Sequence, residues 1–402
     1  MKKVILFLFL GTYLFAELSY EGYLGADMQA YNKSSNKHSS NFTLEQKLKL
    51  SYERNNFISV LELYAQEDSS DYNSKTNNDR SYLRINELYT SYEFEDSKIL
   101  FGKSILFWGA LEVKNIVDGF NIQDKRTDPS KTDKIGAYNI QYSHYFEESE
   151  LSLIVKLYEQ KSKMANASYT YSILGENERL KNKLESEKSL YRPSVYVTYT
   201  GSLSDDIALD YAFIVQNGYD SQRYLRKIAN EYSEHAYLVN KFSTYNTLVL
   251  GSALIKLEFL YTDVLDDKNV ADYYHSAFGL EYTLEQFEAG SELAILGEYY
   301  YYKSKDERIS SDLSRGEIFQ NDLFLGLRYS LNDYGDSTAV GGVIIDTDYK
   351  EENYYVEFET RLYDAFKVKL DLSYTEPSKT HNTIYAQQGR SKKIGLNIAY
   401  YY

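Results

Sequence analysis

The sequence predicts an all-β fold: a transmembrane antiparallel β-barrel of about eighteen strands, within a range of sixteen to eighteen. Three observations predict it: the composition, a period-two alternation of apolar and polar residues, and connections that are short and long in turn. Tyr accounts for 44 of the 402 residues and Pro for only 3. Tyrosine favours strands and collects where a membrane meets water, whereas proline interrupts the hydrogen bonds between strands.

Apolar and polar residues alternate along many segments of the chain. In the segment 365–374, for example, Val368, Leu370 and Leu372 lie between charged or polar residues. This pattern is typical of strands with one apolar face. A soluble sandwich could show it too, but with shorter strands and more evenly spaced turns. We expect strands at 18–31, 41–53, 57–66, 80–94, 98–106, 135–146, 150–159, 192–201, 206–216, 236–250, 253–263, 273–284, 290–302, 319–331, 338–346, 353–362, 365–375 and 391–402.

The connections between these segments alternate in length. Short ones contain Gly251-Ser252 and Asp364, whereas long ones cover 107–134 and 160–191. Short periplasmic turns that alternate with long extracellular loops are typical of bacterial outer-membrane barrels. An even number of strands leaves both chain ends in the periplasm.

Two stretches of the long loops have a helix-like pattern. Glu176 to Lys188 is charged with few helix breakers, and Gln222 to Glu234 carries apolar residues at helical spacing. They could form short lids or plugs, or could be surface loop without regular structure.

The first sixteen residues have the pattern of a secretory signal peptide. Lys2 and Lys3 precede a short apolar run, and Ala16 is suited to the last position before cleavage. The run is too short to span a membrane. We therefore expect a signal peptide at 1–16 and a barrel at 17–402; the loss of Lys2 and Lys3 would take the net charge from −15 to −17. The lack of cysteine fits export and excludes disulfides and thiolate metal sites.

The last segment ends on Tyr402, with Ile394, Leu396, Ile398 and Tyr400 alternating before it. This ending resembles the C-terminal signal by which the barrel-assembly machinery recognises its clients. We expect the mature chain to lie in the outer membrane of a Gram-negative bacterium, in contact with its lipid and lipopolysaccharide. The sequence leaves a monomer and a homotrimer both open.

The segment 101–110 contains the only tryptophan, Trp108. It resembles the Gly-Arg-Gln…Trp-Gly segment of a family of large, uncharacterised proteobacterial outer-membrane barrels, with Lys103 in place of Arg and Ser104 in place of Gln. Further similarities to that family are Lys256-Leu257-Glu258, Gly279-Leu280-Glu281-Tyr282, Gly297-Glu298-Tyr299, the stretch Asn321 to Tyr329, Asn332-Asp333 and Asp336. The resemblance implies a porin-like barrel and no particular substrate.

The connection 107–134 is the third long one. The third loop of general porins folds inward and narrows the pore, and we expect the same here. Its charged residues would then bring both signs of charge to a constriction, which sets ion preference in pores. A solvated surface loop is the alternative. The candidates on and beside this loop are Lys103, Trp108, Asp118, Asp124, Lys125, Arg126, Asp128, Lys131 and Asp133.

Other charged residues alternate with apolar ones inside the expected strands. An arginine or lysine that faces lipid at mid-bilayer costs about 2–4 kcal/mol, so we expect these side chains to face the lumen. There they would wet the lumen and pair across strands, or bind a substrate. They are Lys256, Glu258, Glu292, Glu298, Asp322, Arg328, Glu357, Glu359, Arg361, Lys367, Lys369 and Asp371.

These features favour a porin-like channel for the passive diffusion of small solutes or ions. A substrate-specific channel, for an acidic sugar or a hydrophobic compound, and a plugged barrel with a structural or surface-binding role are the alternatives. The five histidines form no catalytic pattern, so we expect no enzyme, no cofactor and no metal site. The net negative charge argues against nucleic-acid binding.

Overall fold

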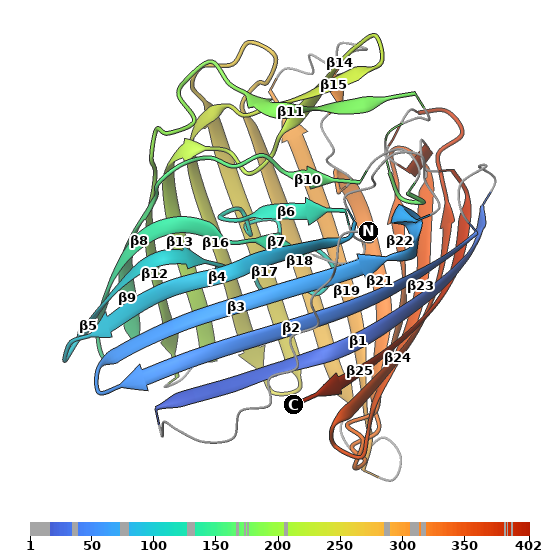
Figure 1. The fold of residues 1–402 in the computed structure, drawn as a ribbon, viewed down its shortest axis with the longest axis horizontal. Helices are drawn as coiled ribbons and strands as arrows, with labels where there is room; N and C mark the ends of the chain where they lie inside the picture. The colour runs from blue at the N-terminus through green and yellow to red at the C-terminus, as the bar shows by residue number, and fades with distance from the viewer. Residues whose placement is uncertain are drawn as a thin grey trace.

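In the computed structural model, eighteen strands form one closed antiparallel barrel (Figure 1). The structure describes residues 17–33, 39–72, 80–126, 133–165, 169–172, 174, 177–204, 208–284, 290–305, 313–314, 319–381, 383, 385–386 and 389–402, so the expected signal peptide lies outside the described residues. The wall strands are β1 (Leu18–Lys33), β2 (Ser40–Arg54), β3 (Phe57–Asp68), β4 (Tyr82–Glu93), β5 (Ser97–Ser104), β8 (Ala137–Tyr145), β9 (Ser149–Lys156), β12 (Ser194–Leu203), β13 (Ala208–Tyr219), β16 (Leu238–Leu250), β17 (Ala253–Val264), β18 (Tyr273–Leu284), β19 (Glu292–Ser304), β21 (Asn321–Ser330), β22 (Thr338–Asp346), β23 (Glu351–Leu362), β24 (Phe366–Glu376) and β25 (Ser391–Tyr401). The predicted barrel and its number of strands are confirmed.

The barrel closes where the first strand pairs with the last. β1 pairs with β2 on one side and with β25 on the other, and Tyr23 lies opposite Tyr401. Gly22 and Tyr402 exchange two backbone hydrogen bonds of 3.1 Å at the end of this seam. Closure leaves no open strand edge, which a lipid environment requires because it offers no other partner to backbone groups.

Shorter elements lie in the long connections. They are the 3-10 helix η1 (Ser69–Asp71) and the strands β6 (Ile122–Lys125), β7 (Lys134–Ile135), β10 (Lys163–Met164), β11 (Arg179–Glu185), β14 (Tyr224–Ile228), β15 (Glu231–His235) and β20 (Leu313–Ser314). β10, β6 and β7 form one small sheet, and β11, β15, β14 and β20 form another. Figure 1 shows β11, β14 and β15 above the upper rim of the barrel and β6 at about its mid-height. None of the helices in the described part of the chain is long and apolar enough to cross a membrane.

The predicted helix-like stretches at 176–188 and 222–234 are wrong. The described residues there form β11 in the first stretch and β14 and β15 in the second. Ala229, with φ 54°, starts the reversal between β14 and β15. The two strands pair with each other and with β11 and β20, and these non-local hydrogen bonds outweigh the weak local preference for helix.

The outer face of the wall is apolar all round. Its exposed residues include Leu24, Phe101, Val215, Leu325 and Ile394, each on a different strand. The inner face differs between two halves of the barrel. On β8, β9, β12, β13 and β16–β19 many inward residues are buried and apolar, and we call this inner surface the packed half. On β1–β3 and β23–β25 the inward residues are mostly charged or polar, and we call this surface the open half.

Candidate functional site

In the connection between β5 and β8, the described residues 105–126 and 133–136 pack inside the barrel, and we call them the inner loop. Trp108, Val117 and Phe120 of this loop form a buried cluster with wall residues Ile154 and Tyr196. The ring centroids of Trp108 and Phe120 lie 5.8 Å apart, and that of Phe120 lies 5.3 Å from Tyr196. The inner loop is therefore held by a hydrophobic core against the packed half.

The apex of the inner loop is held by two buried carboxylates of the wall. Glu258 on β17 accepts backbone hydrogen bonds from Ala110 at 2.7 Å and Ile116 at 2.7 Å, with longer ones from the residues that follow each. Glu298 on β19 accepts from the backbone of Glu112 at 2.6 Å and from the residue after it at 3.1 Å. Glu258 is 0% exposed and Glu298 4%. Six loop N–H groups thus end on two carboxylates, and hydrogen bonds to charged groups are the stronger kind.

Glu112 extends this attachment to a third strand. Arg328 on β21 donates to Glu112 at 2.6 Å and to Glu281 of β18 at 2.9 Å. Lys256 of β17 also contacts Glu281, at 3.1 Å. A network of four charges therefore joins the apex to β17, β18 and β21.

Two glycines make room for the apex. A Cβ atom at Gly279 would come within 2.7 Å of the side chain of Leu111, and Gly109 has φ 139°, a conformation that side chains disfavour. The segments on which the expected family resemblance rests contain Gly109, Glu258, Gly279, Glu281, Glu298 and Arg328. Segments that lie far apart in the sequence thus meet at one point of the structure.

Three of the predicted loop charges, Asp118, Asp124 and Arg126, form local ion pairs. Asp118 pairs with Lys134, and its carboxylate accepts a hydrogen bond from the backbone N–H of Trp108 at 3.3 Å. Burial raises the pKa of Asp118, although the nearby ammonium acts in the opposite direction, and burial lowers the pKa of Lys134. Asp124 pairs with Arg126 and with Arg84 of β4. These charges hold the loop to itself and to the wall; Asp128 and Lys131 lie outside the described residues.

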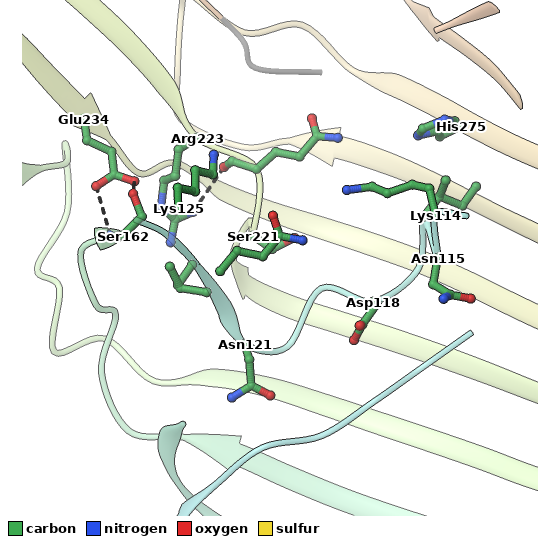
Figure 2. Close-up of a pocket in the computed structure, with 14 residues that line it drawn as sticks. Lys114, Asn115, Asp118, Asn121, Lys125, Ser162, Ser221, Arg223, Glu234 and His275 are labelled. Carbon is green, nitrogen blue, oxygen red and sulfur yellow. Dashed lines mark hydrogen bonds between the residues drawn. The ribbon is translucent and has the colours of Figure 1, made fainter. Parts of the chain in front are cut away.

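A polar cavity of about 110 Å³ lies between the inner loop and two other long connections. Figure 2 shows Lys114, Asn115 and Asp118 on one side of it and Ser162, Arg223 and Glu234 on the other. Glu234 accepts hydrogen bonds from the backbone and hydroxyl of Ser162. The exposed Lys125 also lines this cavity.

Behind this cavity the packed half contains buried ion pairs. Lys156 contacts Glu159 at 2.8 Å, and Arg223 contacts the same carboxylate at 2.5 Å. Asp220 contacts Lys241 at 2.6 Å and accepts a hydrogen bond from the hydroxyl of Tyr273 at 2.6 Å. Lys156 also donates to the carbonyl of Phe120 in the inner loop at 3.2 Å. These pairs join the inner loop and two outer connections to the wall.

A second, larger cavity of about 310 Å³ lies at the open half. Residues of β1, β2, β3, β23, β24 and β25 line it on one side, and Asp133 of the inner loop also lines it. Its lining includes the tyrosines Tyr23, Tyr64, Tyr169 and Tyr401 together with carboxylates, amides and lysines. This larger cavity is therefore lined by both the wall and the inner loop.

The predicted lumen residues divide into three groups. Glu359, Lys367, Lys369 and Asp371 line the larger cavity. Glu357 pairs with Lys369, and Arg361 lies over the ring of Tyr401 at 5.6 Å. Glu258, Glu298, Arg328 and Lys256 hold the inner loop instead of lining free space. Trp108, Asp118, Asp124 and Arg126 form the packing of that loop, while Lys125 lines the smaller cavity.

The prediction that Lys103 faces the lumen is wrong. It shares a face of β5 with Ile99 and Phe101, which are exposed on the outer surface, and it lies opposite the outward Leu88 and Tyr138. Its ammonium donates to the carbonyl of Ile85 at 2.5 Å. A long lysine side chain reaches a polar group while its stem stays on an apolar surface, which removes the energetic argument for an inward position.

Glu45, Glu112, Glu159 and Asp220 were not among the residues predicted from the sequence. Glu45 on β2 stands at an inward position of an alternating strand, so the alternation rule could have included it. Glu112, Glu159 and Asp220 lie in long connections, where no periodicity indicates which side chains become buried. In the part of the chain that the structure describes, no group of three or more histidine or acidic residues is arranged to hold a metal ion.

No protein-family profile matches this chain, and no curated protein matches it. Solved structures with a similar fold include OccAB4 of Acinetobacter baumannii and a BenF-like porin from Pseudomonas fluorescens, each with 9% sequence identity, a TM-score of 0.58 and coverage of 96% of this chain and 98% of that chain. OccK8 (OprE) of Pseudomonas aeruginosa has 9% identity and a TM-score of 0.53, with the same coverage. At this identity the similarity is one of fold, and the chain has the fold of eighteen-stranded outer-membrane porins.

Proposed function

We propose that this protein is an outer-membrane channel through which small polar solutes diffuse passively along the open half of the barrel. The observation that carries the proposal is the cavity of about 310 Å³ between the inner loop and the charged wall. Charged side chains stay hydrated and keep such a space filled with water, whereas the apolar outer face is suited to lipid.

The inner loop acts as the constriction in this proposal. Its core packing and the attachment of its apex to Glu258 and Glu298 hold the apex against the packed half. A solute then passes between the loop and β1–β3 and β23–β25. The similarity of fold to a BenF-like porin supports a channel, although it names no solute for this chain.

A substrate-specific channel is the second candidate. The tyrosines of the larger cavity support it, because aromatic rings bind the apolar faces of solutes. The basic side chains of this wall alternate with carboxylates and pair with them, as Lys367 does with Glu359 at 2.6 Å. An acidic sugar would therefore compete with these carboxylates for the same lysines.

A plugged, surface-binding barrel is the third candidate, and the dense packing of the packed half supports it. Recognition by the barrel-assembly machinery, association as a homotrimer and the absence of enzymatic activity stay predictions.

Single-channel recording in planar bilayers tests the proposal. Refolded protein of residues 17–402 is expected to give stable openings that do not saturate with solute concentration. Openings that one solute blocks or saturates would favour the substrate-specific channel. A protein that is folded by its gel mobility yet never opens would overturn the channel proposal in favour of a plugged barrel.

A further inference from the structure

The basic side chains of the larger cavity are neutralised within the wall. Arg80 contacts Asp68 at 2.7 Å, Lys367 contacts Glu359 at 2.6 Å, and Lys369 contacts its partner on β23 at 2.6 Å. Each of the three lining cations therefore has a carboxylate next to it, and together they add little net charge to the cavity.

Two carboxylates of the same cavity differ from this pattern. Glu45 of β2 accepts hydrogen bonds from the hydroxyl of Tyr64 at 2.7 Å and from the amide of Asn397 at 3.2 Å, and both donors are neutral. Among the described residues, no lysine or arginine forms an ion pair with Glu45 or with Asp133. Within the described part of the chain, no ion pair thus compensates the negative charge of these two groups.

Glu45 and Asp133 line the cavity from two different elements. Glu45 belongs to the wall, and Asp133 belongs to the returning limb of the inner loop. Both are close enough to Tyr23 of β1 to interact electrostatically with it. Tyr23 therefore lies on a stretch of the cavity that both carboxylates influence.

The wall is shaped to hold Glu45 in this position. A Cβ atom at Gly25 would lie 2.9 Å from the Cγ atom of Glu45, so the glycine lets the carboxylate side chain lie across β1. The rings of Tyr23 and Tyr401 lie 5.4 Å apart in the same lining. Tyrosine faces attract cations, so the rings and the two carboxylates favour the same sign of charge.

We propose that Glu45 and Asp133 make the channel selective for small cations, organic ammonium ions included, over anions. This inference rests on the proposed channel function. It names Glu45 and Asp133 as the residues that determine the specificity, because charges on the lining of a pore set its ion preference. The paired charges of the same wall contribute little to that preference.

Reversal potentials in a KCl gradient test the inference. The wild-type channel is expected to favour K⁺ over Cl⁻. The double variant Glu45→Gln with Asp133→Asn is expected to lower the K⁺/Cl⁻ permeability ratio about two-fold or more. The matched control is Glu357→Gln with Lys369→Gln, which removes two lumen charges that sum to zero and is expected to leave the ratio unchanged.

The outcomes separate this inference from the proposed function. A lower ratio in the Glu45 and Asp133 variant alone supports it. Openings with no cation preference in the wild type, or an equal fall in the control, overturn it and leave the channel standing. A wild-type protein that is folded by gel mobility and never opens overturns both.

Discussion

The packed half and the open half of this barrel share one outer face and differ on the inner one. In the packed half, inward residues such as Tyr196, Ala212 and Ile214 are buried, and the inner loop covers several of them. In the open half, inward residues such as Lys369 and Glu357 pair across strands beside solvent. The same barrel wall thus packs against a hydrophobic core in the packed half and lines a polar cavity in the open half.

This difference shows which part of the molecule determines the width of the lumen. Eighteen strands enclose a lumen wide enough for water when nothing fills it. Here the contents of the packed half, and above all the attachment of the inner loop, set the space that remains.

The largest expected effect comes from releasing the apex of the inner loop. Glu258→Ala with Glu298→Ala leaves six backbone N–H groups without their carboxylates, and each buried group left unpaired costs about 1–3 kcal/mol. The loop should leave its place, and single-channel conductance should rise about two-fold or more as the wide lumen opens. Glu21→Ala, which removes an exposed carboxylate of the same wall, serves as the control. Unchanged conductance in the double variant would show that the loop does not limit the path.

The next effect compares one substitution in the two halves. Lys156→Met leaves the buried Glu159 with one cation fewer, and breaking a buried pair costs about 3–5 kcal/mol. Lys369→Met breaks an ion pair that is about one-third exposed, which is worth about 0–1 kcal/mol. The free energy of unfolding in urea, measured in lipid vesicles, checks both values. Equal losses would contradict the distinction between a packed and an open half.

A smaller effect is expected from one methyl group under the apex. Gly279→Ala places a Cβ atom 2.7 Å from the Leu111 side chain, and overpacking of this kind typically costs about 1–3 kcal/mol. Gly297→Ala on the next strand meets only an ordinary contact of 3.8 Å and is the matched control. The conductance noise of the open channel should rise in the first variant alone; similar noise in both would mean that the apex tolerates displacement.

The smallest effect is expected at Lys103. Lys103→Ala removes a cation from the outer face of β5, so the conductance and the reversal potential should stay at their wild-type values. Lys369→Ala, which unpairs a lumen carboxylate, should shift the reversal potential toward stronger cation preference. A shift in reversal potential of equal size in the Lys103 variant would show that Lys103 faces the lumen.

Part of the packed half could have been predicted from the sequence, because one of its strands is apolar on both faces instead of alternating. The strand β13 is apolar on its outward face, yet Ala212 and Ile214 at inward positions are apolar as well. The segment 365–374 has lysines and aspartate at inward positions instead. A strand with two apolar faces indicates that something covers its inner face, although not which loop does so.

The sequence by itself determined the barrel, its eighteen strands and the inward or outward direction of most charged side chains. These properties follow from a two-residue period and from short turns, which are local along the chain. Only the tertiary structure decided that Glu258 binds backbone N–H groups nearly 150 residues away, and that Glu45 and Asp133 face one cavity. Such contacts depend on how a long loop folds back into the lumen. The local alternation of apolar and polar residues does not predict the path of that loop.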